Sequence, residues 1–197
     1  VTGHHIAPGH WYHDDGEGGR VLGNLCHWID STWCMVPPER RYPIRITPVE
    51  FAGNMAVTYL FGDGSLATIN FVSPSEYAFE GVREHYAAHR GQVMVTIDDF
   101  AEMRAQVGPN REHLRLRGRD HGHEASVCRS YALAADRSAD GLSADYVWQL
   151  AELFLATREA VEKNLSATCH ASGQLATTTY TPAAHPDRNS TPSPPNL

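Results

Sequence analysis

The spacing of apolar side chains predicts one helix near the start of the chain, strands through the middle and two helices after them. Val21, Leu25 and Ile29 belong to an apolar stripe with the 3.6-residue period of a buried helix over 20–33, which Pro37-Pro38 would end. The next segments are rich in β-branched and aromatic residues and are divided by Gly-containing turns. They predict about six strands among 44–50, 54–61, 65–72, 79–87, 92–97, 102–107 and 112–117.

After the strands the pattern becomes helical again, from Asp120 and then over 144–165. Segment 44–50 contains and follows prolines, so it is expected to be a short edge strand. This order predicts an α+β fold with an open, mostly antiparallel sheet of about six strands and helices on one face. We expect one domain over 1–170 and a disordered Thr-, Ser- and Pro-rich tail over 171–197.

Composition narrows the class of function. The chain has 197 residues and a formal net charge of −7, which argues against nucleic acid and anionic membranes as partners. No apolar run approaches the roughly 20 residues that span a bilayer, and the first residues lack the pattern of a secretory signal. The four cysteines form no Cys-x-x-Cys pair, so we expect free thiols and a cytoplasmic location.

The segment around the first helix carries the most specific motif. Trp11 and Asp14 precede Gly-Gly-Arg-Val-Leu-Gly-Asn-Leu-Cys-His-Trp-Ile-Asp at 18–30. This arrangement resembles the start of the C-terminal, substrate-binding domain of the Gfo/Idh/MocA oxidoreductases, most closely a subgroup with Gly-Gly-Arg-x-x-Gly-Glu-x-Cys-His-Phe-x-Asp. Phe-Gly-Asp-Gly-Ser-Leu at 61–66 and Asp-His-Gly-His at 120–123 resemble a strand–turn–strand and an Asp-Lys-Gly-His of the same family. The resemblance extends in order over about 4–165.

The resemblance implies a fold, a cofactor and partners. Such enzymes join this domain to a Rossmann domain that binds NAD or NADP, and they oxidise or reduce a secondary alcohol or carbonyl, typically of a sugar or cyclitol. No Gly-x-Gly-x-x-Gly follows a strand in this chain, so we expect no Rossmann domain here. The dinucleotide domain would then lie upstream in a longer chain or on a partner subunit. Family members usually form homo-oligomers through the sheet.

His27 is the candidate catalytic residue. An imidazole titrates near neutral pH and suits proton transfer to or from a substrate oxygen, although a packed structural histidine is the alternative. The sequence departs from the family beside it, because Gly23 stands where many members have an acidic residue and Asn24 where the subgroup has Glu. Asparagine cannot accept a proton, so a relay through a carboxylate at that position is not available.

Further candidates for substrate contact lie in loops and at helix starts. Arg20 could bind an anionic group, and Asn24 occupies the position of the subgroup's Glu. The Asp-His-Gly-His match adds a further histidine, and the glycine-rich first segment adds aromatic and imidazole side chains. The expected substrate-binding set is His10, Trp11, His13, Arg20, Asn24 and His123. The acidic and histidine residues at 4–15 match no zinc spacing, so no metal is expected.

These observations favour the substrate-binding and catalytic half of an NAD(P)-dependent oxidoreductase, inactive alone if it requires its Rossmann half. Two alternatives stay open. One is a stand-alone, non-redox domain that uses its open sheet for dimerisation or binding and a His27 pocket for proton transfer. The other is an inactive interaction module.

Overall fold

A computed structural model of the chain describes residues 1–2, 9–51, 54–72, 82–135, 141–171 and 179–182. The contacts between residues divide the chain into two compact units. Unit 1 comprises Val1–His13 and Asn70–Trp148, and unit 2 comprises Asp14–Ile69 and Gln149–Leu197. Within the described residues the strands form a five-stranded and a four-stranded sheet.

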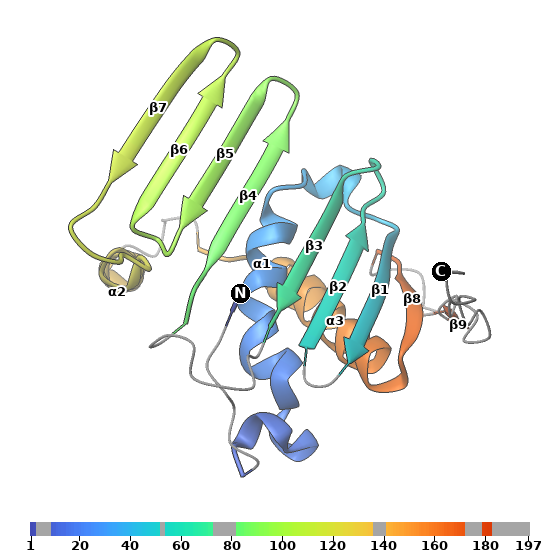
Figure 1. Cartoon of the computed structure of the whole chain (residues 1–197). Helices are drawn as coiled ribbons and strands as arrows, with labels where there is room; N and C mark the ends of the chain where they lie inside the picture. The colour runs from blue at the N-terminus through green and yellow to red at the C-terminus, as the bar shows by residue number, and fades with distance from the viewer. Residues whose placement is uncertain (3–8, 52–53, 73–81, 136–140, 172–178, 183–197) are drawn as a thin grey trace, which may run out of the picture. The chain divides into compact units, whose positions relative to one another are not determined.

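Unit 2 combines helices with the five-stranded sheet (Figure 1). Its strands follow the order β3-β2-β1-β8-β9 and every neighbouring pair that has a defined register is antiparallel. The bounds are η2 Asp15–Glu17, η3 Val21–Leu25, α1 Cys26–Cys34, η4 Pro38–Arg40, β1 Ile44–Phe51, β2 Asn54–Leu60, β3 Leu66–Phe71, α3 Ala144–Lys163, β8 Leu165–Cys169 and β9 Thr179–Pro182. The division between the units falls within β3, after Ile69, and within α3, after Trp148.

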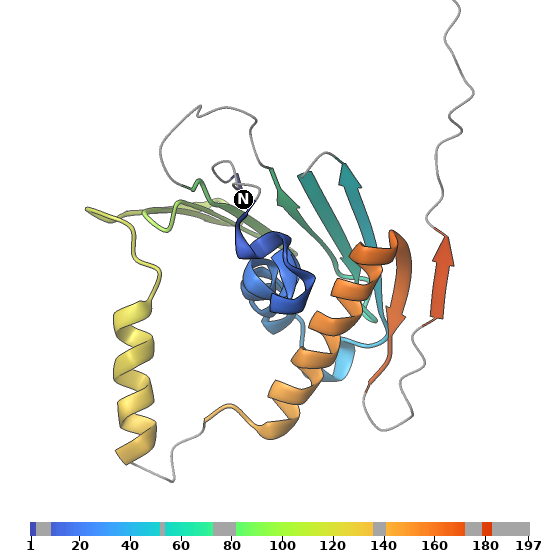
Figure 2. The same ribbon diagram turned by 90° about the horizontal axis from the view of Figure 1, so that it is seen from below.

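The core of unit 2 lies between this sheet and two helices. Figure 2 shows α1 and α3 against the same face of the sheet. Alternate residues of β2 are buried, as expected for a strand with one face on a core. The buried hydroxyl of Tyr59 on β2 and that of Thr157 on α3 form a hydrogen bond of 3.2 Å, which satisfies both polar groups away from water.

Unit 1 contains the four-stranded antiparallel sheet, in the order β4-β5-β6-β7 (Figure 1). Consecutive strands are joined by short turns and pair over six residues each. The bounds are η1 Trp11–His13, β4 His85–Arg90, β5 Val93–Asp98, β6 Glu102–Val107, β7 Asn110–Arg115 and α2 His123–Ala135. None of the residues in these four strands is buried.

The pairing register separates the two faces of the four-stranded sheet. Tyr86, Ile97, Met103 and Leu114 lie side by side across the strands, and the row two positions away is Ala88, Val95, Ala105 and Glu112. The rows between them carry charged and imidazole side chains on the opposite face, because successive residues of a strand alternate. One face is therefore mainly apolar and half exposed, while the other is polar.

The predicted α+β class and the antiparallel pairing are confirmed. The predicted single sheet of about six strands is wrong in detail, since the described residues form nine strands in two sheets. The long helix predicted over 144–165 ends at Lys163, because Asn164 adopts a left-handed conformation with φ of 50°. The next residues form β8, of which only Leu165 falls within the predicted helix.

The prediction of an edge strand at 44–50 is also wrong. β1 lies inside the sheet, between β2 and β8. Its pairing with β8 covers Ile44–Ile46 and stops before Pro48. At Pro48, β1 is therefore paired with β2 on one side only, and its other side has no β8 partner. A proline is tolerated there because it removes no hydrogen bond to β8.

The segment predicted to be a disordered tail contains a described strand. Thr179–Pro182 pairs with Leu165–Thr168 of β8, so disorder is wrong for these four residues. Residues 172–178 and 183–197 lie outside the described residues. The proposed domain boundary at 170 stays a prediction.

Two predictions from the sequence concern the cysteines and the lack of membrane-spanning segments. All four cysteines are free thiols, as the sequence predicted. None of the helices in the described part of the chain combines the length and apolarity needed to cross a membrane.

The turn between β2 and β3 approaches the chain that enters β1 very closely. The Gly62 amide donates to the Arg41 carbonyl at 2.9 Å. A Cβ atom at Gly62 would lie 2.1 Å from the Tyr42 carbonyl oxygen, far inside contact distance. This close approach requires glycine.

We therefore expect Gly62→Ala to lower the free energy of unfolding by about 1–3 kcal/mol, because backbone would have to shift to relieve the overlap. Urea unfolding of the full chain measures the change. Gly141→Ala is the matched control, since a Cβ there meets nothing within 4 Å. Equal stability of the two variants would contradict the packing described.

Candidate functional site

Two glycines set the direction in which the chain enters the helical segment of unit 2. Gly18 and Gly19 have φ of 93° and 62°, a left-handed conformation that disfavours other residues. Both are buried, and the Gly19 amide donates to the Asp14 carbonyl at 3.1 Å. A Cβ at Gly18 would come within 3.0 Å of Leu22. The paired glycines of the motif therefore have a steric role at the helix start.

The first turn of this helical segment is wider than an α-turn. Residues Val21–Leu25 form a π-helix, and the Cys26 amide reaches back to the Val21 carbonyl. From Cys26 the chain continues as the α-helix α1. Such wide turns are rare and occur frequently at functional sites, because they change the direction of the side chains that precede them.

His27 lies in the first turn of α1 and its side chain is exposed. Gly23 stands four residues earlier and places no side chain beside it. Asp30 lies three residues later, on the same side of the helix. The imidazole is thus accessible to a ligand and able to donate or accept a hydrogen bond.

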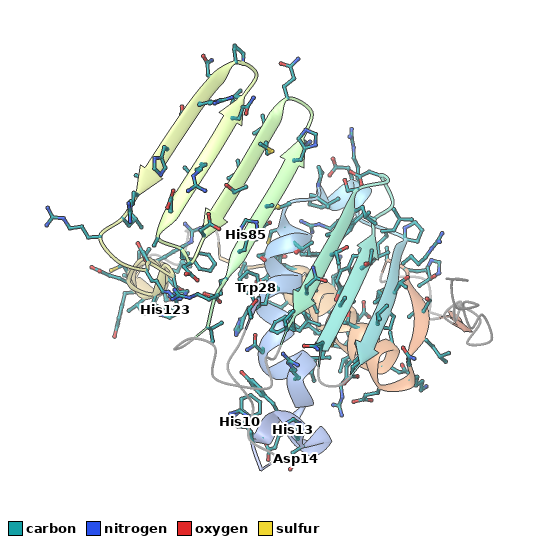
Figure 3. The ribbon with its side chains drawn as sticks, viewed as in Figure 1. His10, His13, Asp14, Trp28, His85 and His123 are labelled. Carbon is teal, nitrogen blue, oxygen red and sulfur yellow. The ribbon has the colours of Figure 1, made fainter. Side chains whose placement is uncertain are left out.

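Arg20 and Asn24 precede His27 on the same helical segment. Both are half-buried, and both make contacts of their own within the protein. Trp28, which follows His27, is also half-buried (Figure 3). The structure therefore brings three of the predicted site residues, Arg20, Asn24 and His27, onto one continuous helical segment.

Cys26 lies beside His27 in sequence but does not act with it. Its thiol donates to the Leu22 carbonyl at 3.0 Å. Burial, the largest influence, raises the pKa of the thiol above its ordinary value. A neutral thiol directed at a carbonyl is not a nucleophile, so the chemistry of this helix rests on the imidazole.

The remaining predicted residues belong to unit 1 and form two groups. His10, Trp11 and His13 lie on or directly before the short helix η1, and the side chains of all three are exposed (Figure 3). His123 is the first residue of α2, and its ring stacks on that of His121 with centroids 5.7 Å apart. His4 and His5 lie outside the described residues.

A charged network that the sequence did not reveal surrounds His121. Its Nε2 lies 3.0 Å from a Glu84 carboxylate oxygen, and its ring contacts Phe100 at 5.0 Å between centroids. These partners are 37 and 21 positions away, so no local motif joins them. In the sequence, only the Asp-His-Gly-His match at 120–123 indicates a functional role for this segment.

The turn between β5 and β6 anchors that network. Asp99 and Phe100 both have φ of 50°, a left-handed conformation that costs non-glycine residues energy. The Asp99 carboxylate accepts hydrogen bonds of 2.8 Å from Arg83 and from the Glu84 amide, and pairs with Arg119 at 3.1 Å. These contacts offset the strain and fix the segment that leads to α2.

A small open cavity lies at the same end of unit 1. It has a volume of about 170 Å³ and is lined by Val1, Thr2, Arg83, Glu84, His85, Asp98 and Asp99. The carboxylates of Asp98 and Asp99 are already engaged by His85 at 2.6 Å and by Arg83. The lining is therefore polar but largely paired with itself.

The described part of the chain contains no group of three His, Cys, Asp or Glu side chains arranged to hold a metal ion. His27, the predicted catalytic residue, has an exposed imidazole on its helical segment.

A comparison with solved structures finds a similar fold in the crystal structure of aldose-aldose oxidoreductase from Caulobacter crescentus complexed with glycerol. The TM-score is 0.58 at 16% sequence identity, over 84% of this chain and 53% of that chain. At this identity the likeness concerns the fold alone. This chain spans about half the length of that oxidoreductase. No family model and no curated protein matches the sequence.

The contacts of Asp99 make a prediction about the stability of unit 1. Burial by itself would raise the pKa of Asp99, but the Glu84 amide, Arg83 and Arg119 together hold this pKa below its ordinary value. We expect Asp99→Asn to lower the free energy of unfolding by about 1–2 kcal/mol at pH 7, measured by urea unfolding. The exposed Glu39→Gln is the control and should change little.

The effect of Asp99→Asn should depend on pH. A carboxyl whose pKa is lowered by folding stabilises the protein above its unfolded pKa of about 4 and loses that contribution as the pH falls through the folded value. The difference between wild type and variant should therefore be full at pH 7 and shrink towards about pH 3. A difference that is constant with pH would contradict this assignment.

Proposed function

We propose that the chain is the substrate-binding and catalytic half of an NAD(P)-dependent oxidoreductase that acts on a secondary alcohol or carbonyl, of a sugar or cyclitol-like compound. The observation that carries the proposal is the exposed His27 on a helix that follows a wide turn, in an oxidoreductase-like fold. The resemblance of 18–30 to the Gfo/Idh/MocA motif supports the same reading.

The residues described here do not fit a dinucleotide. Both sheets consist of antiparallel pairs, and no glycine-rich loop joins a strand to a helix within the described ranges. NAD or NADP would therefore be held by a Rossmann domain outside this chain, where it would exchange a hydride with the substrate carbon.

In this proposal His27 accepts the proton of the substrate hydroxyl during oxidation and returns it during reduction. Because Gly23 and Asn24 supply no carboxylate, the proton leaves His27 directly to water, which its exposed side chain reaches. Arg20 and Asn24 orient polar groups of the substrate along the same helix. His10, Trp11, His13 and His123 are further proposed contacts from unit 1.

We also propose a homo-oligomer that forms through the apolar face of the four-stranded sheet. Val93 and Val107, which pair on this face, are 39% and 48% exposed, and Leu114 on the same face is 51% exposed. Exposed apolar side chains that gather on one face are typical of an interaction surface. A two-fold pairing would place this face against the same face of a second copy, and so remove apolar rows from water on both.

We propose a cytoplasmic location as well, with which the free cysteines are compatible.

One observation favours a different function. Gly23 and Asn24 remove the acidic residues that the family motif has beside the histidine. A stand-alone domain could use the His27 region for proton transfer without redox chemistry, and an inactive module could use the open sheet alone. If replacing His27 changes none of the measured activities, this result would favour the inactive module.

The catalytic proposal is tested with this chain together with the dinucleotide domain that the proposal requires, on the same chain or on a partner subunit. We expect His27→Ala and His27→Gln to lower kcat/KM by about 10²–10⁴, because neither side chain can take up a proton. Spectrophotometric assays with glucose, xylose and myo-inositol, each with NAD⁺ and NADP⁺, measure the change. His89→Ala, an exposed histidine on β4, is the control. Unchanged kcat/KM in both His27 variants would overturn the assignment.

The oligomer proposal is tested by sedimentation velocity on the full chain. Val107→Glu places a charge on the apolar face and should convert the oligomer to a monomer. Gln106→Glu, the preceding residue on the opposite face, should leave the oligomer intact. A monomeric wild type, or an oligomer that both variants preserve, would contradict the proposal.

A further inference from the structure

The strand β7 (Asn110–Arg115) lies at one edge of the four-stranded sheet of unit 1 (Figure 1). It pairs with β6 on one side, and no strand of the described residues pairs with its other side. All six of its residues are exposed. The free side therefore offers backbone N–H and C=O groups to water or to another chain.

The pairing register shows which residues own these free backbone groups. Just beyond the strand, the Leu116 amide donates to the Ala101 carbonyl at 2.8 Å, so this pair is hydrogen-bonded. Hydrogen-bonded and non-hydrogen-bonded pairs alternate along an antiparallel ladder, and Leu114 and Glu112 therefore also bond to β6. The residues between them direct their N–H and C=O groups to the free side, and these residues are Arg111, His113 and Arg115.

The same three residues carry the basic side chains of β7. Because alternate residues of a strand share a face, these side chains lie together on the polar face of the sheet, opposite to Leu114. Nε2 of His113 lies 2.9 Å from a Glu102 carboxylate oxygen on β6. Within the described part of the chain, Arg111 and Arg115 form no ion pair. The free backbone groups thus lie beside two guanidinium groups that have no carboxylate partner there.

These charges disfavour a second copy of the chain at this edge. In a two-fold antiparallel pairing of β7 with itself, the residues that point outward must stand opposite one another. Arg111 would then face Arg115, or one of the basic residues would face itself or His113, whichever register is chosen. Like charges directly opposite each other across two strands are destabilising. An acidic strand would meet the reverse condition, with an attractive pair at each of these positions.

We infer that the free side of β7 binds an extended acidic segment of a partner protein, which adds to the four-stranded sheet as one further strand. Backbone hydrogen bonds to Arg111, His113 and Arg115 would hold the segment, as in other complexes formed by strand addition. Its carboxylates, at alternate positions, would lie beside the three basic side chains, and cross-strand pairs of opposite charge stabilise a sheet. Its intervening apolar side chains would lie beside Leu114, which is 51% exposed. The inference does not depend on the proposed catalytic function.

The test titrates the fluorescein-labelled peptide Thr-Asp-Val-Glu-Val-Asp-Thr with the full chain and follows fluorescence anisotropy. We expect saturable binding that weakens as salt is added, because salt screens exposed charges. The same residues in the order Thr-Val-Val-Asp-Asp-Glu-Thr should bind at least about fivefold more weakly, since this order cannot place all carboxylates on one face of a strand.

A pair of variants at one position tests the backbone hydrogen bonds. His113→Pro removes an N–H group that points to the free side and none that bonds to β6, so the strand should still form. His113→Ala is the matched control, because it removes the same imidazole and keeps the N–H group. We expect His113→Pro to weaken binding at least about tenfold and His113→Ala about twofold. Far-ultraviolet circular dichroism checks that both variants fold.

Two further variants test the charges independently of the proline. Arg111→Gln and Arg115→Gln should each weaken binding about twofold to fivefold. Arg90→Gln, which changes an exposed arginine of β4, should leave the affinity unchanged.

Several outcomes would overturn the inference. They are equal binding of the two peptides, equal affinities of the His113→Pro and His113→Ala variants, and unchanged affinity in both Arg111→Gln and Arg115→Gln. Tighter binding of a labelled heptauridylate RNA than of the alternating peptide would assign this edge to nucleic acid instead. Absence of binding at peptide concentrations up to about 1 mM would also contradict it.

Discussion

The packing of Arg41 on Trp33 governs the architecture of unit 2. The guanidinium carbon lies 3.5 Å from the centroid of the Trp33 ring, and both side chains are buried. The Arg41 Nε donates to the Val36 carbonyl at 2.8 Å, so the buried charge meets both an aromatic face and a carbonyl. This contact joins the last turn of α1 to the chain that enters β1. It therefore holds the last turn of the helix against the segment that leads into the sheet.

The proposed chemistry depends on this anchoring because the same helix carries the candidate histidine at its other end. Trp33 and Ile29 are buried at the helix face that packs inward, while His27 is exposed. A buried, fixed end and an exposed, reactive end are the arrangement by which a rigid helix holds a proton-transfer group in place. The exposed histidines of unit 1 lie in segments that are held differently, by local ring contacts and by charged hydrogen bonds around Asp99.

Local patterns predicted those elements whose partners are near in sequence. The hairpin of β2 and β3 follows from two β-branched runs and a Gly-Asp-Gly turn, and α1 from its apolar stripe. The inner position of β1 and the existence of β8 were not predictable, because both depend on pairing across more than 100 residues. The contact between Glu84 and His121 spans 37 positions, so no local pattern predicts it. The left-handed conformation of Asp99 and Phe100 was not predicted, because turn patterns favour glycine or asparagine there. The motif resemblance located His27, whereas its exposure depends on the packing of the folded chain.

The wide turn at Val21–Leu25 also has a consequence for how such a domain can change over time. It is equivalent to one additional residue in an otherwise regular helix, and each residue rotates the helix by about 100°. Residues before the turn, such as Arg20, can thus be reoriented relative to His27 by losing or gaining one position there, while Ile29 and Trp33 keep their places in the core. The turn thus separates the direction of the side chains before it from the direction of the packing side chains after it. A lineage could therefore redirect the side chain at position 20 without rebuilding the core around Ile29 and Trp33.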